Sequence, residues 1–291
     1  MMTIDNGTLS VSVEAKGAQL KSIRDVASGR EYLWQGDPNI WLERAPNLFP
    51  FVGRLFEKAY TFEGKRYDMG IHGFLRGIEM EERQISGTEC EFTAEASDAT
   101  RAVYPFEFRH TVRYSLEGRR LSVEYRTENL GEGDMWFGVG GHPGFYVPIE
   151  EGLSFEDYCI ELPEGAKPLQ RLMSDAVLNT GLKSPYPLEE GRFIPLRREL
   201  FFNDALVLEN AGGEAAFVSK KGSRAVRLSF PDFKYIGFWQ AAHKDAPYLC
   251  MEPWSVLPGR EGVVEDLTTK PDLTRLAPGA ADVKRWSAEL L

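Results

Sequence analysis

Apolar and polar residues alternate along many short segments of the chain. Residues 9–13 show this alternation, which predicts a β-strand with one face toward solvent. The same period of two runs through residues 108–116 and resumes through residues 121–125, with a turn signal at Glu117-Gly118 between them. These two segments are therefore predicted to form a β-hairpin.

Further segments share the enrichment in β-branched and aromatic residues that is typical of strands. They read ECEFTAEA, DALVLEN, EAAFVSKKGSRAVRLSF and YIGFWQ. Near the C-terminus, GAADVKRWSAELL instead predicts a short amphipathic helix. Because so few helices separate the strands, the pattern favours an all-β fold, a large antiparallel sandwich with few short helices, over a parallel crossover fold.

One segment, residues 162–192, is long and rich in proline and glycine. It reads LPEGAKPLQRLMSDAVLNTGLKSPYPLEEGR. A long connection of this kind in a compact β fold often borders a functional site. Because no repeat, low-complexity tract or linker divides the chain, we expect one domain over residues 1–291.

The composition narrows the possible partners. Hydrophobic residues make up 43% and charged residues 27% of the chain, which is typical of a globular protein. Acidic residues exceed basic ones by 44 to 34, a net charge of −10, which disfavours nucleic acid and anionic membranes as partners. The N-terminal segment resembles no export signal, so we expect a cytoplasmic protein.

Several motifs are missing or incomplete. Cys90, Cys159 and Cys250 are too far apart for a C-x-x-C pair and are expected to be free thiols. The chain has no G-x-S-x-G elbow, P-loop or H-E-x-x-H, and GVGGHPG departs from the dinucleotide pattern at Pro143. Serine-hydrolase, nucleotide-enzyme and zinc-protease functions therefore lack their usual signals.

Four stretches combine glycine, proline and aromatic residues with polar functional groups that strand periodicity does not require. They read NLFPFVGRLFEK, GIHGFLRG, GGHPGFYV and YLCMEPWSVLPG. In the last of these, Glu252 falls at the end of an apolar strand, where burial would raise the pKa of its carboxyl group. Histidines at 72 and 142 lie among glycines, which let the backbone bring an imidazole close to a ligand.

Each candidate is also compatible with a structural role. Turn residues, surface charges and Asx turns account for such positions in many proteins; the candidates concerned are Arg54, His72, His142, Asp204 and Glu252. His110 is in phase with the apolar residues of its strand and is expected in the core, while His243 is expected in an exposed loop. Together, the two imidazoles, the carboxylate, the arginine and the aromatics suit proton transfer on an uncharged polyhydroxylated molecule.

These residues carry a resemblance to a known family. The order Arg54, His72, His142, Asp204, Glu252 within NLFPFVGRL, IHGFLR, GGHPGF and LCMEPW resembles the aldose 1-epimerase (galactose mutarotase-like) family, particularly its LacX-like bacterial branch. The resemblance runs from the first strands to about LAPGA. It implies a large β-supersandwich with a sugar in an open cleft on a concave face.

The resemblance also implies roles for matching residues. Glu252 would be the general base at the anomeric hydroxyl, His142 the general acid at the ring oxygen, and His72 a hydrogen-bond donor near that oxygen. We assign substrate binding to Arg54, Asp204, Phe74 and Trp239.

The reaction opens the hemiacetal, turns the aldehyde end and closes the ring on its other face. With these roles the cycle starts from an ionised Glu252 and a protonated His142, and it requires neither a metal nor an organic cofactor. The expected function is thus an isomerase that interconverts the α and β anomers of a free hexose. The expected partner is a small sugar, and the oligomeric state stays open between monomer and dimer.

The chain departs from the family pattern at two places. Phe56-Glu57-Lys58 replace the Asn-Arg pair of other mutarotases, and Pro-Gly-Phe rather than Tyr-Trp follows the second histidine. A different or broader sugar preference is expected. The alternatives are a hexose-6-phosphate 1-epimerase, for which Arg54 and Arg76 are available, and a non-catalytic sugar-binding protein on the same scaffold.

Overall fold

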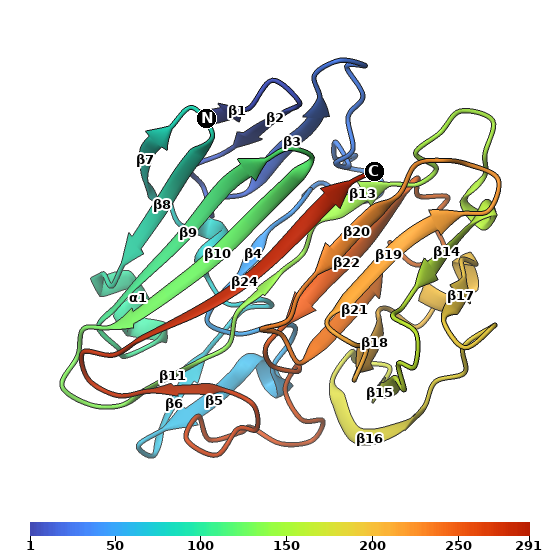
Figure 1. Ribbon diagram of the computed structural model, residues 1–291. Helices are drawn as coiled ribbons and strands as arrows, with labels where there is room; N and C mark the ends of the chain where they lie inside the picture. Colours follow the sequence, from blue (N-terminus) through green and yellow to red (C-terminus); the bar gives the residue numbers. More distant parts are fainter.

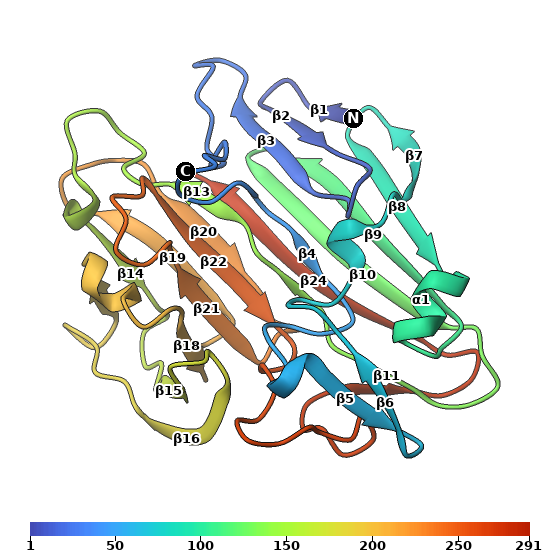
Figure 2. The same cartoon turned by 180° about the vertical axis from the view of Figure 1, so that it is seen from behind.

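Two antiparallel sheets pack face to face and form the body of the protein. The computed structural model describes residues 1–291. Figure 1 shows the larger sheet in front, and Figure 2 shows the smaller one from the other side. The all-β antiparallel fold expected from the sequence is confirmed.

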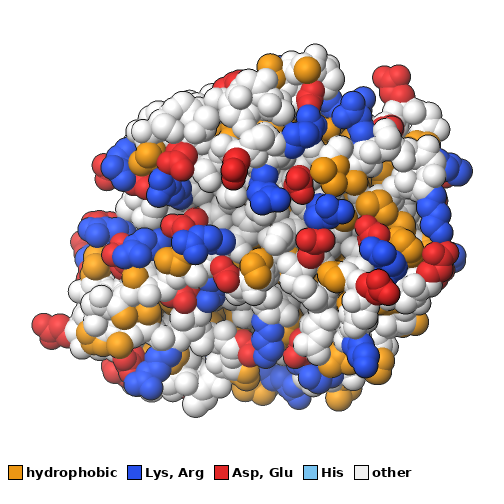
Figure 3. Space-filling view, in the orientation of Figure 1, with side chains coloured by type: hydrophobic (Ala, Val, Ile, Leu, Met, Phe, Trp, Pro, Cys, Tyr) orange, Lys and Arg blue, Asp and Glu red, His pale blue; other side chains and the backbone are white.

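The larger sheet has nine strands. Their order is β17 (Phe193–Pro195), β14 (Tyr158–Glu161), β19 (Glu214–Ser219), β20 (Val226–Ser229), β24 (Ala281–Leu290), β10 (Arg120–Asn129), β9 (Phe108–Glu117), β8 (Glu89–Glu95) and β7 (Glu81–Ser86). The predicted hairpin is β9–β10, in which Leu116 pairs with Leu121. The outer face of this sheet is a mosaic of acidic and basic side chains (Figure 3).

The smaller sheet carries the cavity described below. Its order is β16 (Asn179–Pro185), β15 (Leu169–Met173), β18 (Leu206–Glu209), β21 (Tyr235–Trp239), β22 (Tyr248–Trp254), β12 (Gly140–Gly141) and β4 (Asn47–Leu48), and β13 (Gly144–Tyr146) also pairs with β22. One face packs on the nine-stranded sheet, because residues such as Phe238 and Met251 share a core cluster with Val112 and Val123. The opposite face is free to hold a ligand.

Shorter elements close the ends of the sandwich. They are a three-stranded sheet of β1 (Met2–Asp5), β2 (Leu9–Val13) and β3 (Leu20–Asp25), the pairs β5 (Ala59–Phe62) with β6 (Lys65–Asp68) and β11 (Met135–Phe137) with β23 (Thr274–Leu276), the helix α1 (Asp98–Val103), and the 3₁₀ turns η1 (Phe56–Lys58), η2 (Leu75–Gly77), η3 (Phe155–Asp157) and η4 (Arg198–Phe201). None of the helices has the length and apolar character needed to cross a bilayer.

The prediction of a short C-terminal helix is wrong. Residues 281–290 form β24, which lies between β10 and β20 in the nine-stranded sheet. Trp286, Ala288 and Leu290 are buried with a period of two. The apolar spacing had suited either period, and pairing on both sides of the strand decided for the sheet.

The sequence predicted a long connection over residues 162–192. The structure shows instead that this segment contains the hairpin β15–β16 at the edge of the smaller sheet. Its turn lies at residues 174–178, where the Val177 amide donates to the Ser174 carbonyl at 2.8 Å. Val177 has a φ of 61°, a left-handed conformation that is rare for a β-branched residue. This turn borders the cavity, as the sequence had suggested for the segment.

Candidate active site

A cavity of about 320 Å³ opens on the face of the smaller sheet that is turned away from the core. Strand alternation explains its lining. Ile236 and Phe238 of β21 point into the core, whereas Trp239 points into the cavity. The residues from the sequence prediction that line it are Arg54, His72, His142, Asp204, Trp239 and Glu252. Side chains separated by up to about two hundred positions thus meet in one hollow.

The sheet register places His142 opposite Glu252. Gly140 of β12 pairs with Trp254 of β22, and Gly144 of β13 pairs with Cys250, so the residue midway between the glycines faces Glu252. His142 lies in the gap between the two short strands, where its backbone amide donates to the Pro46 carbonyl at 3.1 Å. Neighbouring strands therefore set the spacing of the imidazole and the carboxylate.

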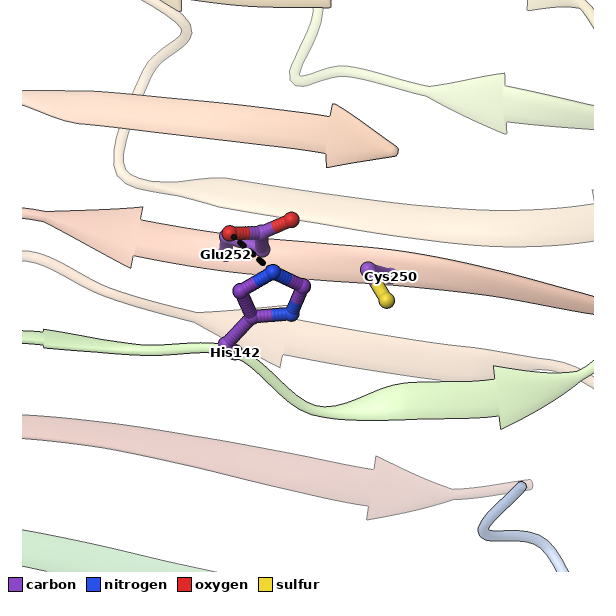
Figure 4. Close-up of side chains that lie close together, drawn as sticks. All are labelled: His142, Cys250 and Glu252. Atoms are coloured by element: carbon purple, nitrogen blue, oxygen red, sulfur yellow. Dashed lines mark ion pairs between the residues drawn. The ribbon is translucent and has the colours of Figure 1, made fainter. Parts of the chain in front are cut away.

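The two side chains are in direct contact (Figure 4). His142 Nε2 lies 3.2 Å from Glu252 Oε2, and both residues are buried, with 8% and 1% exposure. The Trp254 indole N–H also donates to Glu252 Oε2 at 3.2 Å. His142 Nδ1 is buried and has no hydrogen-bond partner within the protein.

Burial favours the neutral forms of both groups. It raises the pKa of Glu252 well above its ordinary value, and the nearby Asp204 carboxylate raises it further. Burial also lowers the pKa of His142 to about 3. This differs from the charged starting pair expected from the sequence. The neutral pair and the charged pair differ only in whether one proton lies on Glu252 Oε2 or on His142 Nε2.

His72 is held as a neutral hydrogen-bond donor. The Gly53 amide donates to His72 Nδ1 at 3.1 Å, so the neutral ring carries its hydrogen on Nε2. Burial, together with the charge of protonated His142, keeps the pKa of His72 well below its ordinary value. His72 has a φ of 65°, and a β-carbon on the adjacent Gly73 would lie 2.1 Å from the Phe49 carbonyl oxygen. This strained turn packs closely against the backbone of Phe49. It places the His72 ring beside that of His142, with the ring centroids 5.6 Å apart.

Arg54 and Asp204 bring opposite charges to the cavity lining. Asp204 has a φ of 74°, and its Oδ1 accepts from the Ala205 amide at 2.8 Å. Burial raises the pKa of Asp204, while the Ala205 hydrogen bond and the Arg54 charge oppose that rise. Arg54 is exposed and has no carboxylate within ion-pair distance, which leaves its guanidinium available to a ligand.

Aromatic rings wall the cavity beside the histidine. Trp41 lies over His142 with ring centroids 5.0 Å apart, and Trp239 meets His142 edge-on at 5.5 Å. The sequence analysis missed Trp41 and its neighbour Glu43, which both line the cavity. The segment IWLER combines aromatic and charged residues, but it lacks the glycines used as the signal elsewhere.

Phe74, expected to contact the sugar, does not line the cavity. Its ring packs instead against Phe49, Tyr104 and Phe108, with centroids 5.8 to 5.9 Å apart. The turn that points His72 toward the cavity directs Phe74 into the core. His110 is buried as expected, and His243 is exposed as expected.

Cys250 lies two residues before Glu252, on the same face of β22, and close to the His142–Glu252 pair (Figure 4). Its Sγ and the nearest ligand atoms of His142 and Glu252 lie within 4.8 Å of one another. Burial raises the pKa of Cys250 well above its ordinary value, so the thiol stays protonated. All three cysteines are free, as expected.

Comparison with known proteins agrees with this architecture. The aldose 1-epimerase family model matches residues 1–272. The LacX protein of Lactococcus lactis is 30% identical, with complete coverage of both chains. Two solved structures superimpose with TM-scores of 0.95: a galactose mutarotase related enzyme from Lactobacillus acidophilus (32% identity, covering 100% of this chain and 97% of that one) and a galactose mutarotase-like protein from Lactobacillus casei (31% identity, covering 100% of both).

The match over almost the whole chain and the fold lead to the same assignment. The protein is an isomerase and belongs to the aldose 1-epimerase family.

Proposed function

We propose that the protein is an aldose 1-epimerase that interconverts the α and β anomers of a free hexose. The observation that carries the proposal is the contact of His142 with Glu252 inside a sugar-sized cavity. Proton transfer by groups held in such positions accelerates reactions by about 10²–10⁴-fold per group.

The short separation of the two groups suits the reaction. The anomeric hydroxyl oxygen and the ring oxygen are both bonded to C1, so the base and the acid must act at two neighbouring atoms. Two groups whose reactive atoms lie 3.2 Å apart can reach two such atoms from one side. The pair therefore needs to lie side by side, as His142 and Glu252 do.

The proton count of the pair supports the cycle. Burial favours the shared proton on Glu252 rather than on His142. Transfer of that proton to His142 gives the charged pair without exchange with solvent, and sugar hydroxyls can supply hydrogen bonds to both charges. Glu252 then takes the hydroxyl proton, His142 protonates the ring oxygen, and the bond from C1 to the ring oxygen breaks. Closure on the other face returns both protons.

The surrounding groups support binding of a sugar. His72 offers Nε2–H as a neutral donor beside His142, while Arg54 and Asp204 can bind hydroxyls. Trp41 and Trp239 can cover the apolar C–H face of the ring. We keep the assignments of Arg54, Asp204 and Trp239 to substrate binding and add Trp41.

The test is NMR or polarimetry of freshly dissolved α-D-glucose and α-D-galactose with the wild type and with Glu252→Gln. We expect the wild type to speed equilibration, and the variant to lose about 10²–10⁴-fold in kcat/KM with an unchanged circular dichroism spectrum. A variant that keeps full rate would refute Glu252 as the base. A wild type that binds sugars without speeding equilibration would support a carbohydrate-binding protein instead.

A further inference from the structure

The cavity carries an ion pair that the proposed chemistry does not use. Arg76 Nη1 donates to Glu43 Oε2 at 3.0 Å, and both residues line the cavity. Each side chain keeps 32% of its surface exposed, whereas His142 and Glu252 are almost fully buried. The pair therefore lies nearer the mouth of the cavity than its floor.

Short connections tie this ion pair to the reactive groups. Glu43 follows two residues after Trp41, whose ring lies over His142. Arg76 lies in η2, four residues after His72. The Arg76 charge also lowers the pKa of both histidines, which shows that it acts electrostatically on the centre of the cavity. A charged substituent on a sugar would meet this field.

We infer that Glu43 is a specificity-determining residue that restricts the site to uncharged sugars. An arginine side chain binds phosphate and carboxylate groups well, and Nη1 of Arg76 already donates to Glu43. A phosphorylated or carboxylated sugar would have to displace Glu43 and then lie beside an unpaired carboxylate. Selectivity commonly rests on such a repulsive element. The inference rests on the proposed anomerase activity.

The charge balance of the lining supports this inference. With Glu252 protonated, the cavity has two cationic side chains, Arg54 and Arg76, against the carboxylates of Glu43 and Asp204. Replacing Glu43 with glutamine keeps the shape of the side chain but frees Arg76 and leaves an excess of one positive charge. The same cavity would then favour an anionic sugar.

The experiment compares neutral and anionic sugars. Exchange between anomers is measured by NMR at equilibrium for D-glucose, D-glucose 6-phosphate and D-glucuronate, with the spontaneous rate subtracted. For Glu43→Gln we expect the ratio of kcat/KM for either anion to that for glucose to rise roughly tenfold or more over the wild type. Glu43→Ala should move the ratio in the same direction, which covers a glutamine variant that fails to fold.

Two comparisons show whether the gain passes through Arg76. The double variant Glu43→Gln/Arg76→Gln should lose the gain. Glu89→Gln is the matched control, because it breaks an ion pair of similar exposure, Arg113–Glu89 (40% and 33%), on the nine-stranded sheet. It should leave the ratio of kcat/KM for the anionic sugars to that for glucose unchanged.

An unchanged ratio in both Glu43 variants, a gain that survives loss of Arg76, or a wild type that prefers the anionic sugars would each overturn the inference. A wild type inactive on all three sugars and on D-galactose would instead overturn the proposed function.

Discussion

Two buried histidines of this protein have the same pKa shift and very different surroundings. Burial lowers the pKa of both His110 and His142 to about 3. His110 lies in the core between the sheets, where Nδ1 shares a hydrogen bond with the Thr127 hydroxyl at 2.9 Å and the ring stacks on Phe49. His142 instead contacts Glu252 and lines a cavity. A perturbed pKa alone therefore does not identify a reactive group; an ionisable partner and access for a ligand do.

The largest expected effect separates the two histidines by activity. His142→Gln removes the acid and should lower kcat/KM for glucose anomerisation by about 10²–10⁴-fold. Its stability should change little, because the side chain faces a cavity. The measurement is NMR exchange, with urea denaturation as the control for folding. A His142→Gln enzyme within threefold of the wild-type rate would show that His142 is not the general acid.

The opposite pattern is expected for His110→Ala. It leaves a hole beside Phe49 and breaks the Thr127 hydrogen bond, so the free energy of unfolding should fall by about 2–4 kcal/mol. Urea denaturation measures this change. Activity of the folded fraction should stay near that of the wild type, and a large loss of kcat at full folding would mean that the core transmits its packing to the cavity.

The pH dependence of the activity should report the proton that His142 and Glu252 share. Activity needs one proton on the His142–Glu252 pair. It should fall at low pH, when both groups are protonated, and at high pH, when the pair loses its proton. Burial lowers the pKa of His142 and raises that of Glu252, so the acid limb moves below the ordinary histidine value and the alkaline limb well above the ordinary glutamate value.

The profile of kcat/KM should consequently have a broad plateau and fall about tenfold per pH unit beyond each limb. Polarimetry in a series of buffers of different pH measures this profile. A profile centred on an ordinary histidine pKa would indicate that the pair is hydrated in the working enzyme.

The smallest effect is expected for the ring that covers His142. Trp41→Ala removes the aromatic contact and should raise KM for glucose by about 2–10-fold, with a smaller change in kcat. Initial-rate kinetics with several sugar concentrations measure the split. Trp34→Phe, which changes a buried ring that does not line the cavity, is the matched control. A larger fall in kcat than rise in KM would place Trp41 in the chemistry rather than in binding.

Local patterns predicted the strands that pair with sequence neighbours. The β9–β10 hairpin follows from alternation and one turn, both of which are local. The segment 281–290 was misjudged because Val283, Trp286 and Leu290 suit a helix, while the deciding interactions come from β10 and β20, which lie far away in the sequence. Long-range pairing of this kind has no local signal.

The candidate site was foreseen in part for the same reason. Glycines and prolines around His72 and His142 mark irregular backbone, and the structure brings both residues into one cavity with Glu252. Trp41 reaches the cavity from a segment without such markers. Phe74 shared the promising context of His72, but one turn of the chain points neighbouring side chains in opposite directions, and this depends on the fold as a whole.

The gap between β12 and β13 has a consequence for how new substrate preferences can arise. The pairing of β12 and β13 with β22 sets the distance between the His142 imidazole and the Glu252 carboxylate. Changes in the connecting segments should therefore leave this distance unchanged. The segments that carry Trp41, Glu43 and Val177 lie outside the ladder. Mutation can therefore remodel what enters the hollow while the proton-transfer distance stays constant.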